Sequence, residues 1–274
     1  MGLGLKQRRD GEGSGVDASA RRADLVLVLA SLGALGLFPL VPFRWAWLAL
    51  TLVLAAVTEA SRRRRALPAL HLGLLCTGLL GALSAFGSMK FWPLPPLLAV
   101  LAYAAAVARL PALGGRPSWL RVGRLDRGVW RLMFVSVFVS ALALLLWFAL
   151  AKPDYSALVG TLFPRLPLPL LFAGVVGFSL INAAIEELIY RGVLLGALDA
   201  TLGVGMLPVV LQAGVFGIVH IAGFPRGLAG VGLASIYGLL MGAVRRRARG
   251  MLGPWLAHVV TDVVIGSILL RALL

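Results

Sequence analysis

Long apolar runs constrain this chain more than any other feature of its sequence. A run of about 18 or more nearly uncharged residues predicts a transmembrane helix, because the hydrocarbon core of a bilayer is about 30 Å thick. Several runs approach or exceed this length, and only 14% of all residues are charged. Soluble domains carry about 25% charged residues. The sequence therefore predicts an all-α fold: a polytopic transmembrane helical bundle of about eight or nine spans.

The expected spans divide into two groups behind a polar tail. Residues 1–23 are polar and rich in glycine, which predicts a disordered N-terminal tail. Residues 24–151 hold five spans of unassigned role, and residues 168–274 hold four. The nine expected spans are 24–43, 45–60, 66–88, 92–110, 130–151, 168–198, 204–223, 227–244 and 251–273. The sixth would measure about 46 Å as a straight helix, so it must tilt, protrude or break.

Basic residues indicate how the chain is oriented. With the N-terminus inside and alternating spans, nineteen of the 26 Lys and Arg residues fall inside, in the tail and in 62–65, 109–131 and 245–249. This bias predicts a cytoplasmic N-terminus. The net charge of +15 therefore reflects membrane topology, and no nucleic acid is expected as a partner. The 23 Arg and 3 Lys residues are typical of a GC-rich genome and favour a bacterial cytoplasmic membrane. Interfacial anchors are expected at Trp45, Trp47, Trp92, Trp130 and Trp255.

A few ionisable side chains fall deep in the apolar spans of the second group. They are the acids Glu186, Glu187 and Asp262 and the histidines His220 and His258. A charge in hydrocarbon costs roughly 2.5 kcal/mol or more, so intramembrane ionisable residues indicate a functional site. The single cysteine lies in an apolar span and allows neither an intrachain disulfide nor a cysteine-cluster metal site.

Helical spacing predicts how residues around the paired glutamates are arranged. Glu187 and Arg191 are four residues apart, which predicts a structural ion pair. Glu186 is rotated by about 100° and faces another neighbour, with Asn182 and Tyr190 one turn either side on its face. This leaves Glu186 without an obvious partner on its own helix. A lone carboxylate in a dry interior is a candidate general base.

The same spacing recurs on the next polar spans. Phe216 and His220 are four residues apart, and so are His258 and Asp262. Three spans therefore each direct polar groups inward. No serine or cysteine is flanked by the base and orienting group of a nucleophile triad, so the chemistry that suits this set is activation of a water.

Three motifs in this half of the chain resemble those of a known family. "EELIYR" (186–191) fits EExxxR, "FGIVH" (216–220) fits FxxxH, and "HVVTD" (258–262) fits HxxxN/D. In this order, over about residues 168–270, they resemble the CPBP family of CAAX prenyl proteases and bacteriocin-processing (Abi) proteins.

The resemblance implies a glutamic-type intramembrane endopeptidase that needs no cofactor. Glu186 and His220 would activate the water, Glu187 would support the site, and His258 and Asp262 would stabilise the oxyanion. Eukaryotic members have Asn where this chain has Asp262, and Asn can donate a hydrogen bond. The implied substrate is a membrane-associated peptide or protein, such as a C-terminal sorting segment.

Two other readings stay open on the sequence alone. Glu186, His220 and His258 could form a three-ligand zinc site of a metal-dependent membrane hydrolase, although no HExxH pair is present. Buried acids and histidines also build proton-coupled transporters, which would require polar residues along a path through several spans.

Overall fold

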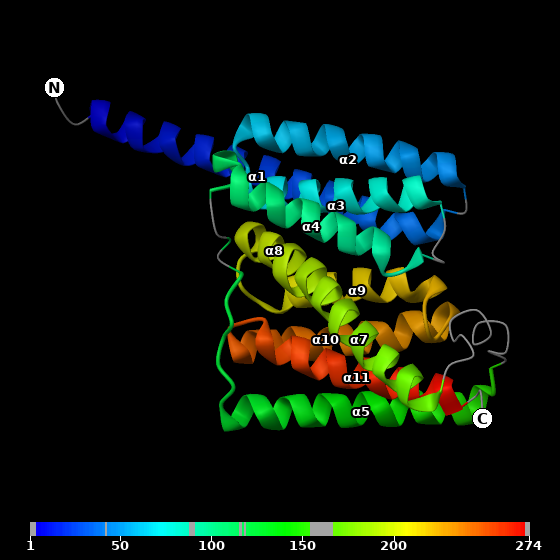
Figure 1. Cartoon of the computed structure of the whole chain (residues 1–274). Coiled ribbons are helices and arrows are strands. Elements are labelled where there is room, and N and C mark those ends of the chain that lie inside the picture. The colour runs from blue at the N-terminus through cyan, green and yellow to red at the C-terminus, as the bar shows by residue number, and fades with distance from the viewer. Residues whose placement is uncertain are drawn as a thin grey trace.

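The chain is helical throughout the part that the structure describes. A computed structural model describes residues 4–41, 43–87, 91–114, 117, 119–153 and 167–271, and these contain no strand (Figure 1). The main helices are α1 (Gly4–Leu37), α2 (Arg44–Arg64), α3 (Leu67–Phe86), α4 (Leu94–Arg109), α5 (Arg127–Ala151), α7 (Leu168–Glu187), α8 (Leu195–Leu202), α9 (Met206–Val219), α10 (Gly227–Ala248) and α11 (Leu252–Arg271). Two short elements matter for the site: the π-helix η4 (Leu188–Leu194) and the 3-10 turn η5 (His220–Ala222). The predicted all-α fold is confirmed.

Six helical segments in the described part of the chain are long and apolar enough to cross a membrane. They are Arg21–Leu40, Leu67–Phe86, Arg127–Ala151, Leu168–Leu202, Gly227–Ala248 and Leu252–Arg271. Two further apolar helices, Leu94–Arg109 and Met206–Ala222, are shorter. Large apolar side chains such as Phe134 and Phe138 of α5 are exposed, as a lipid-facing surface requires. The chain is an integral, multi-pass membrane protein.

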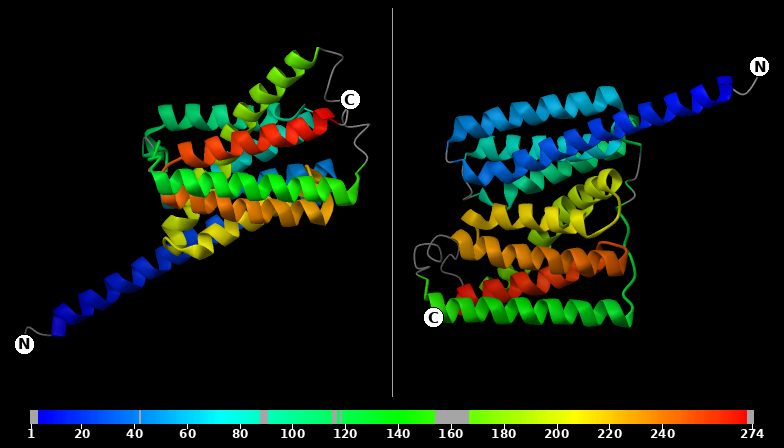
Figure 2. Two further views of the ribbon diagram at one scale, coloured as in Figure 1. Left: turned by 90° about the horizontal axis from the view of Figure 1, so that it is seen from below. Right: turned by 180° about the vertical axis from the view of Figure 1, so that it is seen from behind.

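The helices form two groups that one long helix joins. Helices α1 to α4 pack on one another, and α9, α10, α11 and α5 form the second group (Figures 1 and 2). The continuous helix α7–η4–α8 packs against α11 through α7 and against α1 and α3 through α8. The sixth expected span is therefore one helix that extends to Leu202, with a π-helical segment and no break.

Helix α5 differs from the grouping expected from the sequence. We expected it with the first four spans, but it packs against α10 and α11 at the far side of the molecule from α2 (Figure 1). The connection between α4 and α5 makes this possible because it runs alongside the bundle. Arg124 N donates to Ala248 O at 2.9 Å, and Met251 N donates to Arg121 O at 2.8 Å, which ties the connection to the turn before α11.

The N-terminal segment also differs from expectation. Residues 4–23, for which the sequence predicts a disordered tail, are the first turns of α1, and they project beyond the other helices (Figure 1). No proline interrupts the chain before Pro39, so the helical hydrogen-bond pattern of the apolar part of α1 can extend back into these residues.

Successive long helices run in alternating directions, as the predicted topology requires. The turn after α2, the connection after α4 and the turn after α10 all lie at the end from which α1 emerges (Figure 1). These are the Arg-rich connections counted as internal. Arg116, which we counted as internal, and Lys90 and Arg165, which alternation of the spans puts on the other side, lie outside the described residues. The side of the membrane that this end faces stays a prediction.

Candidate functional site

The two adjacent glutamates lie at the end of α7, directly before the π-helix. Glu186 is 8% exposed and Glu187 is 1% exposed. Arg191, inside η4, is fully buried, and its Nη1 lies 3.0 Å from Glu187 Oε1. The predicted ion pair is present, and the contact is mainly charge–charge because Nη1 lacks the alignment of a hydrogen bond. A π-helical turn is common where a helix carries a functional side chain.

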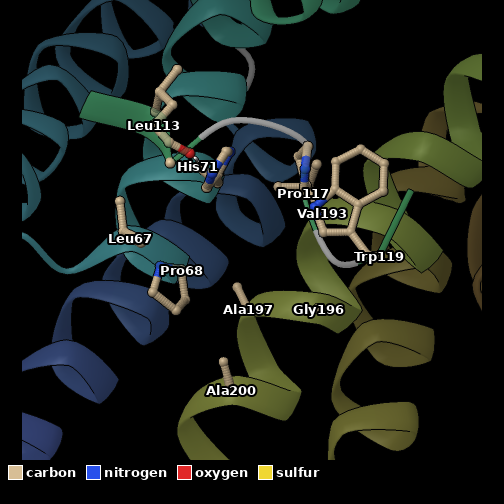
Figure 3. Close-up of a pocket in the computed structure, with 11 residues that line it drawn as sticks. Leu67, Pro68, His71, Leu113, Pro117, Trp119, Val193, Gly196, Ala197 and Ala200 are labelled. Carbon is tan, nitrogen blue, oxygen red and sulfur yellow. Dashed lines mark hydrogen bonds between the residues drawn. The ribbon is translucent and has the colours of Figure 1, made fainter. Parts of the chain in front are cut away.

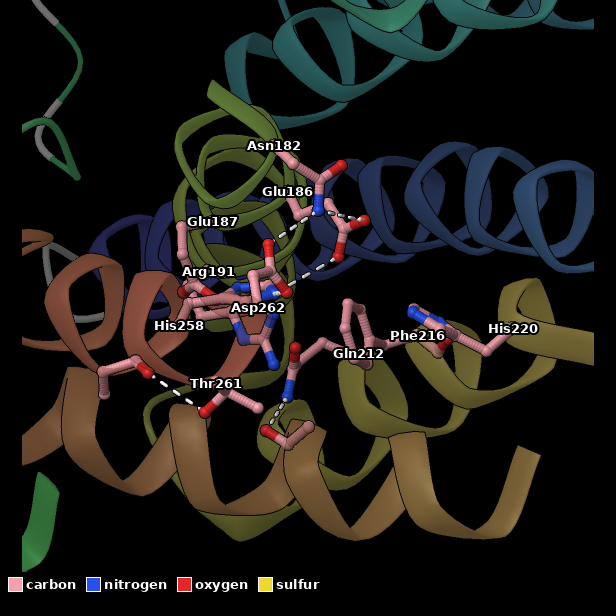
Figure 4. A network of polar contacts seen from close by, with 12 residues as sticks. Asn182, Glu186, Glu187, Arg191, Gln212, Phe216, His220, His258, Thr261 and Asp262 are labelled. Carbon is pink, nitrogen blue, oxygen red and sulfur yellow. Dashed lines mark hydrogen bonds and ion pairs between the residues drawn. The ribbon is translucent and has the colours of Figure 1, made fainter. Parts of the chain in front are cut away.

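His258 of α11 lies between the glutamates and makes the pair part of a larger cluster. Its Nδ1 donates to Glu187 Oε1 at 2.7 Å. Its Nε2 lies 3.7 Å from Glu186 Oε2 and 3.5 Å from Asp262 Oδ1. The predicted Glu187–Arg191 pair is therefore one part of a larger set of buried contacts. The packing of α7 on α11 inserts the imidazole between two carboxylates that helical geometry had assigned to different neighbours (Figure 4).

Asn182 gives Glu186 a partner on its own helix, contrary to our expectation. Asn182 is 6% exposed, and its Nδ2 donates to Glu186 Oε1 at 3.3 Å and to Asp262 Oδ2 at 3.0 Å. Its Oδ1 accepts from Trp92 Nε1 at 2.8 Å. Trp92, which we expected to be an interfacial anchor, therefore reaches the cluster. No sequence signal joins residues ninety positions apart.

Phe216 of α9 is the apolar centre around which the cluster packs. Its ring is 1% exposed and lies 4.8 Å from the ring of Tyr190 and 6.3 Å from that of His258, measured between centroids. The Arg191 guanidinium carbon lies 4.4 Å from the Phe216 centroid. This cation–π contact explains why a phenylalanine is useful here, since it lowers the cost of burying the guanidinium.

His220 lies outside the carboxylate cluster. Its ring is 4.4 Å from the Phe216 ring, and in Figure 4 it lies beyond Phe216 from Glu186. Nδ1 donates to the Phe216 carbonyl at 2.7 Å, which in the neutral ring leaves the lone pair on Nε2. No contact among the described residues joins His220 to Glu186. That the two share one water stays a prediction; in the structure α9 ends at His220, and the ring packs back on its own helix.

Two carboxylate oxygens of the cluster have no hydrogen-bond donor among the described protein atoms. The second oxygens of both glutamates, Glu186 Oε2 and Glu187 Oε2, are buried and hydrogen-bond to no described protein atom. Such oxygens can accept a proton or a hydrogen bond from a bound molecule. Within the described residues, no three His, Cys, Asp or Glu side chains are arranged to hold a metal ion.

A pocket of about 210 Å³ lies away from this cluster, on the far side of the π-helix. It is bordered by α3, the connection around Leu113 and the Gly196 turn of α8 (Figure 3). His71 lines it, but both ring nitrogens are already bonded, Nδ1 to Tyr103 Oη at 2.8 Å and Nε2 to the Leu113 carbonyl at 3.1 Å. The chemistry of the buried carboxylates makes their cluster, and not this pocket, the candidate active site.

Sequence reasoning also missed a buried amide near the site. Gln212 of α9 is fully buried, and its Nε2 donates to the carbonyls of Val209 and Gly238. A bond to the backbone of α10 ties the helix that carries Phe216 to its neighbour. Close packing of α9 on α10 also depends on Gly238, where a Cβ would meet Ala213 of α9 at 2.9 Å.

Comparison with known proteins gives one family match, which covers about a third of the chain. Residues 167–264 match the model of a family described as type II CAAX prenyl endopeptidase Rce1-like. The match spans α7 to most of α11 and includes all three motifs, which confirms the resemblance drawn from the sequence. No curated protein and no solved structure matches the chain.

Proposed function

We propose that this chain, whose residues 167–264 carry the Rce1-like family region, is a glutamic-type intramembrane endopeptidase. The observation that carries the proposal is the state of Glu186. Its carboxylate is buried, Asn182 holds Oε1, and Oε2 forms no hydrogen bond to a described protein atom. A general base needs a carboxylate with one oxygen fixed by a hydrogen bond and the other oxygen able to accept a proton.

The proposed reaction uses Glu186 to activate a water. Glu186 Oε2 accepts a proton from the water while the water oxygen attacks the carbonyl carbon of the scissile peptide bond. The tetrahedral intermediate then collapses, the C–N bond breaks, and the proton passes from Glu186 to the leaving nitrogen. The reaction is a hydrolysis with no change of oxidation state, and its products are a new carboxyl terminus and a new amino terminus.

His258 supports the negative charge that forms on the carbonyl oxygen. An imidazolium carries an N–H at each nitrogen, and here each nitrogen faces a carboxylate: Nδ1 faces Glu187, and Nε2 faces Glu186 and Asp262. An N–H at Nε2 would be directed to the same region as Glu186 Oε2, where the substrate carbonyl would lie. Preorganised donors of this kind contribute about 3–4 kcal/mol to transition-state stabilisation.

His220 completes the proposed site from α9. The family resemblance implies that it shares the water with Glu186, and its bond to the Phe216 carbonyl leaves Nε2 as an acceptor. Because its ring lies across Phe216 in this conformation, the proposal requires the end of α9 and Glu186 to approach each other when substrate binds. The short turn at His220–Ala222 ends at Gly223, and the end of α9 can shift at this turn.

The substrate class follows from the location of the site. Glu186, His258 and Asp262 lie on helices long and apolar enough to cross a membrane, so the scissile bond must lie in or near the membrane-associated part of a peptide or protein. A prenylated C-terminal tail and a C-terminal sorting segment both satisfy this condition. We propose a bacterial cytoplasmic membrane with the N-terminus inside, supported by the arginine-rich connections at one end of the bundle, and no cofactor.

The proposal can be tested with purified protein in lipid vesicles. One sample receives a farnesylated CAAX peptide, and a second receives membrane proteins from cells that lack the gene. New peptide termini are identified by mass spectrometry for the wild type, for Glu186→Gln and for Glu59→Gln, a control at an exposed glutamate of α2. A chelator is added in a parallel series.

Termini that appear with the wild type and Glu59→Gln but not with Glu186→Gln would support the proposal, and the sample in which they appear identifies the substrate class. If neither sample yields a terminus that depends on Glu186, the chain is not this kind of protease. If the chelator abolishes cleavage, the metal-dependent alternative is correct.

A further inference from the structure

The group of helices outside the family region contributes one side chain to the carboxylate cluster. Trp92 lies in the connection between α3 and α4, and its indole Nε1 donates to Asn182 Oδ1 at 2.8 Å. Trp92 is half-buried, whereas Asn182 is buried inside α7. The first four helices thus touch the site by a directed polar contact.

This contact determines which way the Asn182 amide faces. An amide has an oxygen that only accepts and a nitrogen that only donates. Because the indole N–H can only donate, the amide oxygen must face Trp92. The nitrogen then faces the opposite side, where Glu186 Oε1 lies at 3.3 Å and Asp262 Oδ2 at 3.0 Å. Both amide hydrogens are used, one for each carboxylate.

The reverse orientation would be unfavourable for the cluster. With the amide flipped, its oxygen would face two carboxylate oxygens and donate nothing. Both carboxylates would then lose a hydrogen bond in a buried environment, where an unpaired polar atom is costly. The indole N–H therefore selects the amide orientation that holds the two acids apart and in place.

We propose that Trp92 is a positioning residue of the active site, which acts through Asn182 to fix the carboxylates of Glu186 and Asp262. The inference rests on the proposed function for its catalytic consequence, but the contact itself can be tested without proteolysis. It gives the N-terminal helices a role: they supply the outer end of a hydrogen-bond chain whose inner end is the general base.

The kinetic test compares two tryptophans that make the same bond in different places. Trp92→Phe keeps an aromatic side chain and removes the pyrrole ring with its N–H. Trp47→Phe is the matched control, because Trp47 Nε1 donates at 2.8 Å to the Val41 carbonyl, away from the site. We expect Trp92→Phe to lower kcat about 2- to 10-fold, the range for one net hydrogen bond, with KM little changed. Trp47→Phe should leave kcat unchanged.

A double-variant cycle tests whether Trp92 acts through Asn182. In the Asn182→Ala background, Trp92→Phe should have no further effect on kcat. The positioning role is refuted if Trp92→Phe lowers kcat by the same factor in the Asn182→Ala background as in the wild type. It is also refuted if Trp92→Phe in the wild-type background leaves kcat unchanged, as Trp47→Phe should. The substitution Trp92→Phe is made both in the wild type and in Asn182→Ala, so any effect that it has on folding enters both comparisons. The cycle therefore still tests the positioning role if Trp92→Phe is less stable than the wild type.

Nuclear magnetic resonance separates this inference from the proposed function. The seven tryptophans give indole N–H signals, and the signal that Trp92→Phe removes is that of Trp92. Asn182→Ala should shift this signal and leave that of Trp47 in place. An unshifted Trp92 signal would refute the contact even in an active enzyme. A shifted signal in a wild type that cleaves nothing would refute the proposed function and support the contact.

Discussion

Removal of the buried guanidinium should destabilise the protein far more than removal of an exposed one. Arg191→Met keeps most of the side-chain volume but leaves Glu187, which is 1% exposed, with only His258 as a partner. Breaking a buried ion pair from one side costs about 3–5 kcal/mol, because the buried charge that remains loses a charged partner. The lost contact with the Phe216 ring contributes up to about 2 kcal/mol of the same total. We therefore expect the free energy of unfolding to fall by about 3–5 kcal/mol.

Two further variants distinguish a loss of stability caused by the charge on Glu187 from one caused by a general loss of packing. Glu187→Gln with Arg191→Met leaves no unpaired charge and keeps an oxygen for the His258 Nδ1 donor, so it should recover most of the loss. Arg246→Met breaks a pair with Asp199 whose side chains are 28% and 21% exposed, and it should cost at most about 1 kcal/mol.

The assay is reversible unfolding in mixed micelles, with the free energy of unfolding measured for all four proteins. The reasoning fails if Arg191→Met is no less stable than Arg246→Met. It also fails if the double variant is as unstable as Arg191→Met alone, since the cost would then come from packing.

Three other substitutions give outcomes that the structure fixes in direction. Asp262→Asn should keep substantial activity, because Asn can still accept from Asn182 through its oxygen; complete loss of cleavage would show that a carboxylate is required. Phe216→Leu should lower the free energy of unfolding by about 2 kcal/mol as the guanidinium loses its aromatic partner, and an unchanged stability would contradict this. Asp126 accepts from Val129 N and Gly128 N at the start of α5, and the bond to Val129 contributes most to holding its pKa below the ordinary 3.8. A folded-state pKa below the unfolded one stabilises the protein above the unfolded value, so Asp126→Ala should melt below the wild type at pH 7, and the difference should shrink as the pH falls below 3.8. A difference that is constant with pH would contradict this assignment.

The fold could be predicted well because its signals are local. Apolar runs of bilayer length give the spans, and each main helix of the structure from α1 to α11 corresponds to an expected span or part of one. The grouping of the helices was harder to predict from the sequence, because only its packing against α10 and α11 places α5 in the second group. No local pattern distinguishes a lipid-facing span that packs on one neighbour from a span that packs on another.

The candidate site was predictable in its members and less so in its connections. Helical spacing gave the Glu187–Arg191 pair, and the deep acids marked Glu186 and Asp262. The contacts of His258 with both glutamates and of Trp92 with Asn182 depend on how helices far apart in sequence pack together. The position of His220 depends on where α9 ends and on the ring of Phe216, which the four-residue spacing alone does not determine.

The central claim is that Glu186 is the general base of peptide hydrolysis within the membrane. The most direct test is the turnover of purified Glu186→Gln in lipid vesicles, with the substrate that the vesicle assay yields, measured beside the wild type and Glu59→Gln. General acid–base catalysis contributes about 10²- to 10⁴-fold to the rate. We therefore expect kcat of Glu186→Gln to fall at least about 10²-fold, while its melting temperature stays at the wild-type value. A folded Glu186→Gln protein that cleaves the substrate at the wild-type rate would contradict the claim.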